Sequence, residues 1–469
     1  MKIECEKEKI IFSPSKNKTM EQGTIWGHPK GLFILFFTEL WERFSYYGMR
    51  AILVLYLTAE TTDKINPGLG WTSKEALVLY GWYGMFVYFM GIFGGAIADK
   101  WLGQKKSVLY GGILIILGQF ALAVEGMTTF YTGLILLVSG VGLLKPNIST
   151  MVGGLYKTGD ARRDTGFTIF YIGINIGAVL APIIVGFYGE KVDWHLGFSL
   201  AGFGMIIGQV VYVYGRKYLT GVGELLKHSE EHAHLINQPL TKIEKDRMTV
   251  MFISFLIVMV FWAAYEQAGG LMNLYARDKI DRFVFGYEIP TSFFQSLHAL
   301  YVVILGAPMA WFWIRWRKKG KESSSIFKMG VGSIIMSIGF VALMGAAYDV
   351  SVSALDKAPV YWLFLSYLLH VVAELSLSPV ALSFITKLAP LKYASLMMGT
   401  YFAIVGLGNK LAGMLGEAAQ DAGEMAVFAG IAVTTFLLGV LILLFVNKLK
   451  ALAHGAEDID PKIAFVEPE

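Results

Sequence analysis

The sequence predicts an all-α protein that crosses a membrane many times. Of its 469 residues, 55% are hydrophobic and only 16% are charged, and the mean hydropathy is +0.55. Soluble domains average about 25% charged residues, so this is the composition of a polytopic membrane protein. Apolar windows of about 20 residues, long enough to cross a bilayer as a helix, recur along the chain. They predict twelve transmembrane helices in two six-helix bundles.

The apolar windows place the twelve spans in chain order. Several exceed 20 residues, which implies tilted helices. We expect Gly269-Gly270 to end the seventh span. We also expect prolines to bend other spans, although ordinary helix curvature is the alternative for them. The predicted spans are 31–57, 76–98, 107–125, 128–149, 166–188, 196–215, 248–270, 292–315, 327–348, 359–385, 391–416 and 425–447, and the prolines are Pro146, Pro182, Pro308 and Pro379.

The longest connection divides the spans six and six. It is rich in Lys, Glu and His, and two further spans would need about 40 apolar residues, more than it holds. Two joined bundles suggest a major-facilitator fold with a site between them near mid-membrane. The expected domains are an N-terminal tail (1–30), an N-terminal six-helix bundle (31–215), a linker (216–247), a C-terminal six-helix bundle (248–447) and a C-terminal tail (448–469).

Positive charges in the short loops predict the orientation. The even-numbered loops are basic, whereas most odd-numbered loops are acidic or sparsely charged, so the linker and both termini are expected in the cytoplasm. The first 30 residues hold no apolar core long enough for a signal peptide. We therefore expect a multi-pass protein of the cytoplasmic (inner) membrane. Its only cysteine is Cys5, and its net charge of +4 is poor evidence for a nucleic-acid partner.

The first span carries charged side chains at a depth where they are costly. Ionisable groups within a transmembrane helix indicate a substrate or proton pathway by default. At 100° per residue the polar side chains fall within an arc of about 140° and so share one face. An ion pair between Glu39 and Arg43 that only holds the bundle together is the alternative. The polar stripe consists of Glu39, Glu42, Arg43, Tyr46, Tyr47 and Arg50.

Further charges within the spans balance in number. Lys145, Glu266, Glu374 and Lys410 join the stripe of span one, giving four acids and four bases. Three of the cations lie in the N-terminal bundle and two of the acids in the other. This division suits a zwitterionic ligand, with its carboxylate at Arg43 and Lys145 and its ammonium group at Glu374. Lys410 could instead extend toward a membrane surface.

The histidines favour structural over chemical interpretations. His298 and His370 are expected to be packed, hydrogen-bonded side chains rather than proton relays. The group His228, His232 and His234 lies in the linker, where a solvated segment is favoured over a metal site, and we expect no metal or other cofactor besides the coupling protons. Because no nucleophile–base pair is apparent, an enzyme is the least favoured class.

These motifs resemble the proton-dependent oligopeptide transporter (POT/PTR) family of the major facilitator superfamily, in its prokaryotic type. The pattern Glu39-x-x-Glu42-Arg43-Phe44-x-Tyr46-Tyr47 matches the family signature of the first span, and the similarity extends from about residue 31 to 445. Further matching stretches are Gly94-Gly-Ala-Ile-Ala-Asp99, Leu144-Lys-Pro-Asn147, Arg162-Arg-Asp164 with Gly166-Phe167, Glu266-Gln267, and Glu374 with Pro379.

The resemblance implies a role for each site residue. Arg43 and Lys145 would receive the peptide carboxylate, and Glu374 would receive the amino terminus. Glu39, Glu42 and Glu266 would carry protons, with Lys145 in communication and Arg50 paired with Glu266. The other residues implied to contact the peptide are Tyr46, Tyr47, Tyr88 and Asn175, together with His298 and Tyr401, where the family often has asparagine and tryptophan.

The expected function is proton-driven uptake of di- and tripeptides by alternating access, by a protein active as a monomer in the lipid bilayer. Carriage of a peptide-like drug, nitrate or another zwitterion is an alternative within transport. A peptide sensor that does not transport is the alternative from another class. The linker differs from that of many bacterial members, because it lacks the two extra helices that they commonly insert between the bundles.

Overall fold

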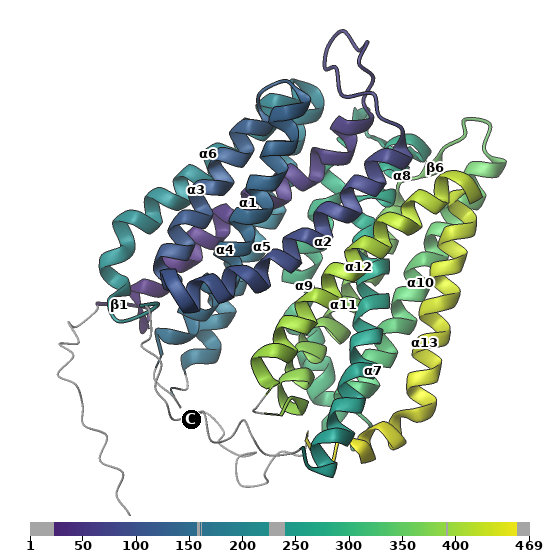
Figure 1. The fold of residues 1–469 in the computed structure, drawn as a ribbon. Helices are drawn as coiled ribbons and strands as arrows, with labels where there is room; N and C mark the ends of the chain where they lie inside the picture. The colour runs from purple at the N-terminus through teal and green to yellow at the C-terminus, as the bar shows by residue number, and fades with distance from the viewer. Residues whose placement is uncertain (1–22, 157–159, 161, 225–239, 391–392, 457–469) are drawn as a thin grey trace, which may run out of the picture.

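The computed structural model describes residues 23–156, 160, 162–224, 240–390 and 393–456. Two groups of helices lie side by side and are closest along α2 and α12 (Figure 1). Each group has its own hydrophobic core. Most of the N-terminal tail, much of the linker with His228, His232 and His234, and most of the C-terminal tail lie outside the described residues.

The first bundle contains the six spans expected of it. Its elements are α1 (Lys30–Thr58), α2 (Ser73–Ile97) continued by the π-helical turn η1 (Ala98–Leu102), α3 (Gln104–Leu122), α4 (Met127–Gly154), α5 (Arg162–Lys191), and α6 (Trp194–Gly215) followed by the 3-10 turn η2 (Arg216–Leu219). Pro146 and Pro182 lie inside α4 and α5.

The second bundle also contains six spans, the first of them interrupted. Its elements are α7 (Lys242–Tyr265), the 3-10 turn η4 (Glu266–Gly269), α8 (Leu271–Lys279), α9 (Phe293–Lys318), α10 (Ser325–Val352), α11 (Tyr361–Leu388), α12 (Ala394–Ala422) and α13 (Glu424–Leu452). Pro308 and Pro379 lie inside α9 and α11.

The predicted spans are confirmed as helices, with one correction. The seventh does not close at Gly269-Gly270, because the chain breaks there and resumes as α8 to Lys279. Glycine permits this close approach, since a Cβ at Gly269 would lie 2.2 Å from the Tyr80 hydroxyl. Ten helices of the described residues are long and apolar enough to cross a membrane. α1 is not among them because of its buried charges.

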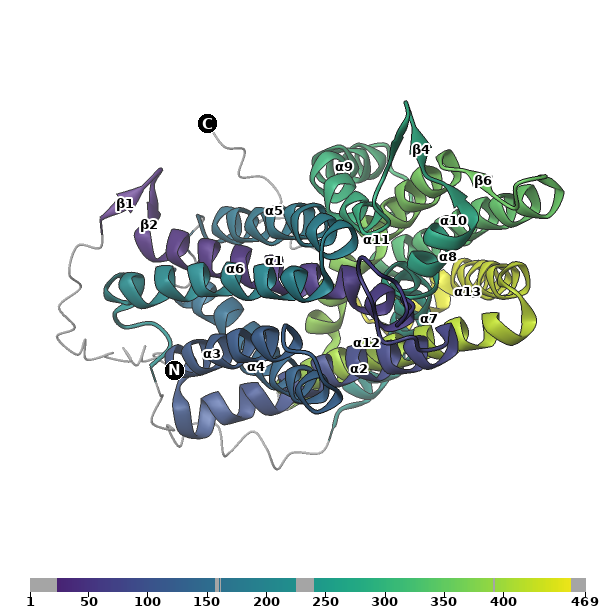
Figure 2. The ribbon, with the colours of Figure 1, turned by 90° about the horizontal axis from the view of Figure 1, so that it is seen from above.

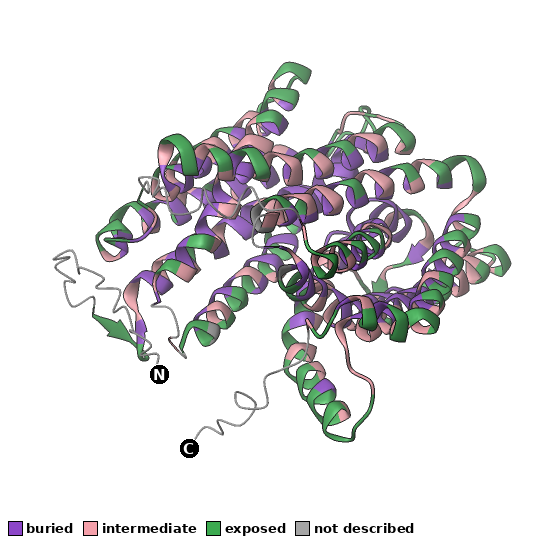
Figure 3. Ribbon diagram, turned by 60° about the horizontal axis from the view of Figure 1, so that its bottom comes forward, coloured by how far each residue is buried: buried purple, intermediate pink, exposed green. Residues whose placement is uncertain are grey.

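Exposed and buried residues divide as expected of a protein surrounded by lipid. Buried positions lie along the insides of the helices, while exposed positions lie on their outer faces (Figure 3). Large apolar side chains such as Ile135 and Leu444 are exposed on those outer faces. Such a surface suits contact with acyl chains rather than water.

Three pairs of short strands lie outside the spans. β1 (Thr24–Ile25) pairs with β2 (His28–Pro29), and β4 (Phe283–Val284) pairs with β5 (Tyr287–Glu288), both antiparallel. β3 (Ile280–Asp281) pairs in parallel with β6 (Ala358–Pro359). We call the end of the bundles from which residues 216–247 depart the linker end, and the opposite end the far end. β3–β6 and β4–β5 lie at the far end, and β1–β2 lies at the linker end.

Candidate functional site

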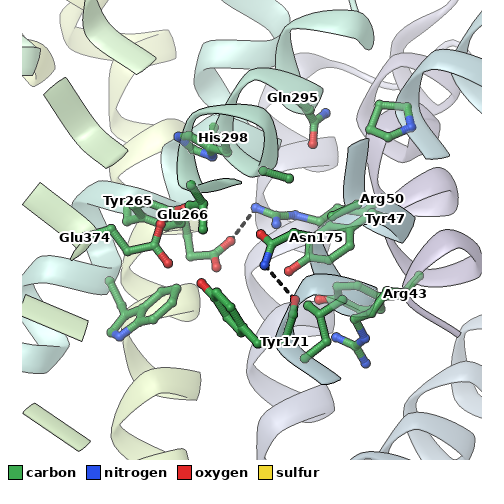
Figure 4. Close-up of a pocket in the computed structure, with 18 of the residues that line it drawn as sticks. Arg43, Tyr47, Arg50, Tyr171, Asn175, Tyr265, Glu266, Gln295, His298 and Glu374 are labelled. Atoms are coloured by element: carbon green, nitrogen blue, oxygen red, sulfur yellow. Dashed lines mark hydrogen bonds and ion pairs between the residues drawn. The ribbon is translucent and has the colours of Figure 1, made fainter. Parts of the chain in front are cut away.

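A cavity of about 140 Å³ lies between the two bundles. Helices α1, α2 and α5 form one wall, and α7, η4, α9 and α11 form the other (Figure 4). Nine of the predicted site residues line it: Arg43, Tyr46, Tyr47, Arg50, Tyr88, Asn175, Glu266, His298 and Glu374. Residues 43 and 374 come from opposite bundles, so a cation and a carboxylate face one cavity from its two sides.

The acids of α1 are engaged by the arginine that follows them. Arg43 donates from Nη2 to Glu42 Oε1 at 2.7 Å and from Nε to Glu42 Oε2. Its Nε also lies 3.2 Å from Glu39 Oε1. Tyr46 lies beside the guanidinium, with the ring centroid 5.1 Å from Arg43 Cζ. Glu39 and Glu42 are buried behind Arg43 and do not line the cavity.

A second ion pair crosses from one bundle to the other. Arg50 Nη2 lies 2.5 Å from Glu266 Oε2, and Arg50 Nε donates to the Tyr80 hydroxyl at 3.0 Å. Tyr80 in turn donates to Glu266 Oε2 at 3.2 Å. Glu266 is the first residue of η4, where the α-helix breaks. The break therefore places its carboxylate opposite Arg50. The pairing expected of Arg50 and Glu266 is therefore present in the structure.

The opposite wall is built around Glu374 and aromatic rings. Tyr265 donates its hydroxyl proton to Glu374 Oε2 at 2.6 Å and stacks on His298 with ring centroids 4.5 Å apart. The imidazole also meets the edge of Tyr367 at 4.7 Å. Among the described residues, His298 Nε2 has no hydrogen-bond partner. His298 is thus packed as predicted, with Nε2 unbonded among the described residues, and it lines the cavity. His370 is fully buried with Nε2 3.5 Å from Ser366 Oγ.

Lys145 and Arg43 line different cavities. Lys145 lines a second cavity of about 570 Å³ between α2, α4 and α12. Tyr88 lines both cavities, and its ring centroid lies 4.7 Å from Lys145 Nζ. Tyr401 is buried and lines neither cavity. Lys410 lies away from both, with Nζ 4.3 Å from the centroid of Trp82.

Several lining residues were not predicted from the sequence. Asn175 Nδ2 donates to the Tyr171 carbonyl at 2.8 Å, and this neighbour itself lines the cavity (Figure 4). Tyr265 precedes Glu266 in the chain, and its position beside that acid could have indicated it. The others carry no pattern that distinguishes them from packing residues. The main additions are Tyr171, Trp262, Tyr265 and Gln295.

Within the described ranges, no group of three or more His, Cys, Asp or Glu side chains could hold a metal ion. What this cavity presents instead is fixed charges and hydrogen-bonding aromatic groups. Guanidinium groups bind carboxylates through two parallel hydrogen bonds, and a carboxylate binds an ammonium group. The arrangement can therefore bind a small ligand and exchange protons.

Comparisons with known proteins identify the family. The model of the POT family matches residues 105–227 and 224–429. The chain is 36% identical to a di-/tripeptide transporter of Lactococcus lactis, over 91% of this chain and 97% of that protein. It is 33% identical to the peptide transporter YePEPT of Yersinia enterocolitica, over 92% and 97%.

Solved structures agree with the sequence comparisons. The fold is similar to a crystal structure of the peptide transporter POT in complex with sulfate, with a TM-score of 0.85 and 35% identity over 92% of this chain and 97% of that one. A POT family transporter in complex with 5-aminolevulinic acid gives 0.83 at 28% identity, over 91% and 98%. With the Glu39-to-Tyr47 signature and the cavity between its bundles, this chain belongs to the POT family of transporters.

Proposed function

We propose that the protein is a proton-coupled symporter that imports di- and tripeptides by alternating access, as a monomer in the cytoplasmic membrane with both termini in the cytoplasm. One observation carries the proposal: a single buried cavity has Arg43 from one bundle and Glu374 from the other. A short peptide carries opposite charges at its two ends, so it can bridge these walls. The relatives named as peptide and di-/tripeptide transporters support this substrate class.

Peptide binding at Arg43 would be coupled to protonation. The guanidinium group of Arg43, which would receive a peptide carboxylate, is held by Glu42. A proton on Glu42 removes its negative charge, which releases Arg43 to pair with the ligand. Lys145, whose Nζ lies 4.7 Å from the centroid of Tyr88, would act on the same acids and on the peptide carboxylate. The peptide amino terminus would pair with Glu374, which Tyr265 already orients at 2.6 Å.

The pair between Arg50 and Glu266 would couple a proton to the bundle movement. It joins α1 to the turn η4 across the boundary. Protonation of Glu266 would neutralise one partner and weaken the attraction between the bundles. A proton moving inward gains about 2.3 kcal/mol per 100 mV of membrane potential. That free energy can drive peptide accumulation.

Uptake in liposomes tests the proposal. Purified protein with an inward proton gradient should accumulate labelled dialanine, and Glu42→Gln or Arg43→Ala should abolish accumulation. Lys410→Met is the matched control, because this intramembrane cation lies against Trp82 outside the cavity; it should retain uptake. Peptide binding without gradient-driven accumulation would instead identify a sensor. Accumulation of 5-aminolevulinic acid or nitrate, but not dialanine, would identify a carrier of other small solutes.

A further inference from the structure

Two β-hairpins at opposite ends of the molecule share an unusual turn. The β1–β2 turn is Trp26-Gly27 and the β4–β5 turn is Phe285-Gly286. In both, the aromatic residue has φ of +50° and the glycine has φ of +77° or +79°. Two-residue turns with positive φ favour Asn, Asp and Gly. A bulky side chain there costs about 1–2 kcal/mol. Each turn therefore carries an aromatic residue against its local backbone preference.

Among the described residues, neither aromatic side chain has enough packing contacts to offset the cost of its backbone conformation. Trp26 is 86% exposed and Phe285 is 106% exposed. The only ring contact of Trp26 among the described residues is with the edge of Phe33 of α1, at 5.7 Å. Phe283 and Tyr287 of the second hairpin are also exposed. The described residues therefore leave both rings largely uncovered.

Both hairpins are held by polar contacts. In the first, Arg162 Nη1 donates to the carbonyl of the turn residue Gly27 at 2.8 Å, and His28 Nδ1 lies 2.8 Å from the Tyr156 hydroxyl. In the second hairpin, Arg282 donates to the Ile289 carbonyl and to Glu288, each at 2.7 Å. These contacts fix the position of each hairpin, while Trp26 and Phe285 stay largely exposed.

Their positions match the two surfaces of a bilayer. Each hairpin shortly precedes a spanning helix, α1 at the linker end and α9 at the far end. With 29 and 26 residues, these helices are about 44 and 39 Å long. A hydrocarbon layer is about 30 Å thick, so the helix ends reach the headgroup regions. In Figure 2 both hairpins stand out sideways from the helices, β4–β5 beyond α9 and α11.

We propose that Trp26 and Phe285 are interfacial anchors, which insert at the boundary between headgroups and acyl chains on opposite membrane surfaces. Trp and Tyr concentrate at that boundary, where their rings meet lipid and their polar groups stay hydrated, and Phe rings insert beside them on interfacial segments. One exposed aromatic ring in the first hairpin and three in the second suit insertion among lipids, whereas a stable protein interface buries about 800 Å² per partner. The inference is independent of which solute the protein carries.

Depth-dependent fluorescence quenching tests the anchors in the whole protein. Cys5, the only cysteine, is changed by Cys5→Ser, and a fluorophore is attached at Phe283→Cys or Thr24→Cys, which leaves each anchor in place. The protein is placed in nanodiscs, one copy each. Nitroxide near the headgroups should quench both labels, and aqueous iodide should not. Asp356→Cys is the matched control, because Asp356 is exposed at the far end with φ of +51°; its label should respond to iodide.

Removing an anchor should reverse the pattern at its own hairpin only. Phe285→Asn should abolish nitroxide quenching at position 283 and expose that label to iodide, and Trp26→Asn should do so at position 24. Asparagine tolerates positive φ, so both variants should fold. Iodide quenching of the labels with the anchors intact would overturn the proposal. So would shielding from both quenchers, which would indicate that protein covers the tips.

Discussion

The two ends of the boundary between the bundles differ in how they are held. At the far end, polar contacts cross it: Lys191 Nζ lies 2.7 Å from Glu288 Oε2, and Lys74 Nζ lies 2.8 Å from Asp421 Oδ2. At the linker end, ion pairs such as Lys105–Glu224 and Lys450–Glu322 stay within one bundle. There the second cavity, of about 570 Å³, opens between α2, α4 and α12.

This difference identifies the conformation and what must change in it. The far end is closed by bonds that water can replace, and the second cavity lies toward the linker end. Alternating access requires the reverse state, so the polar contacts of the far end are the ones that must break. Between the ends, Arg50–Glu266 and the close approach of α2 to α12 hold the bundles together. The following variants alter these contacts from the most buried to the most exposed.

The buried ion pair should give the largest effect. Arg50→Ala leaves the Glu266 carboxylate with Tyr80 alone, and removing one partner of a buried pair costs about 3–5 kcal/mol. We expect peptide uptake in liposomes to fall by roughly two orders of magnitude or more. The neutral combination of Arg50→Met with Glu266→Gln should recover thermal stability but not gradient-driven uptake. Full uptake by Arg50→Ala would show that the pair has no part in closure.

The glycine contact between α2 and α12 should give the next effect. A Cβ at Gly413 would lie 2.7 Å from Gly81 Cα and from the Leu77 carbonyl oxygen, too close for any real contact. Gly413→Ala should therefore force the helices apart and lower stability by about 1–3 kcal/mol, seen as a lower Tm. Gly430→Ala is the control, because α13 offers open space there; it should not lower Tm. Equal Tm values for the two variants would contradict this.

The sequence predicted local features of this boundary better than its long-range contacts. Helical periodicity placed the polar stripe of α1 on one face, and that face does meet the other bundle. Periodicity cannot relate Arg50 to Glu266, which lie 216 residues apart; the family resemblance supplied that pairing. The expectation that Arg43 and Lys145 jointly bind a carboxylate came from charge balance, which does not show that Tyr88 lines both cavities.

The irregular segments were the least predictable. Gly269-Gly270 indicated a break, but the pattern did not show that a helix resumes as α8, because a nine-residue helix carries little periodic signal. The two-residue strands offer no alternation of apolar and polar residues. Their turns place Trp26 and Phe285 where Asn or Gly is typical, so turn chemistry does not predict them. These elements depend on tertiary contacts that no local pattern records.

Glu190 should give a moderate effect on the far end alone. At the end of α5, it accepts hydrogen bonds from Thr291 N at 2.9 Å and Ser292 N at 2.7 Å, at the start of α9 in the other bundle. Removing such a cap costs about 0.5–2 kcal/mol. Glu190→Gln should therefore raise the population open at the far end by about 2- to 30-fold.

Cysteine labelling measures that shift. In the Cys5→Ser background, Ala299→Cys places a thiol in the cavity, and an impermeant maleimide added on the far side should react faster in Glu190→Gln. Glu60→Gln, an exposed acid in a far-end loop, is the control and should leave the rate unchanged. If the labelling rate in Glu190→Gln is no faster than in this control, Glu190 does not help to close the far end.

The exposed pair Lys191–Glu288 should give the smallest effect, and only in acid. The hydrogen bond from Lys191 holds the pKa of the Glu288 carboxyl below its ordinary value of 4.5. A carboxyl with a lowered pKa stabilises the closed state at pH values above its ordinary pKa. This stabilisation is lost as the pH falls through the lowered pKa. Because both side chains are about a third exposed, the contact contributes less than about 1 kcal/mol.

Titration of Glu288 should therefore leave the distance between the bundles at the far end constant from pH 7 to 5.5. That distance should increase only below about pH 4.5. Spin labels at Val192→Cys and Tyr287→Cys, on opposite sides of the contact, would report that separation. In Glu288→Gln the acid-dependent part should vanish while any change near neutral pH persists. If the low-pH change survives this substitution, it belongs to the buried carboxylates of the cavity, and the far end closes without help from its exposed ion pair.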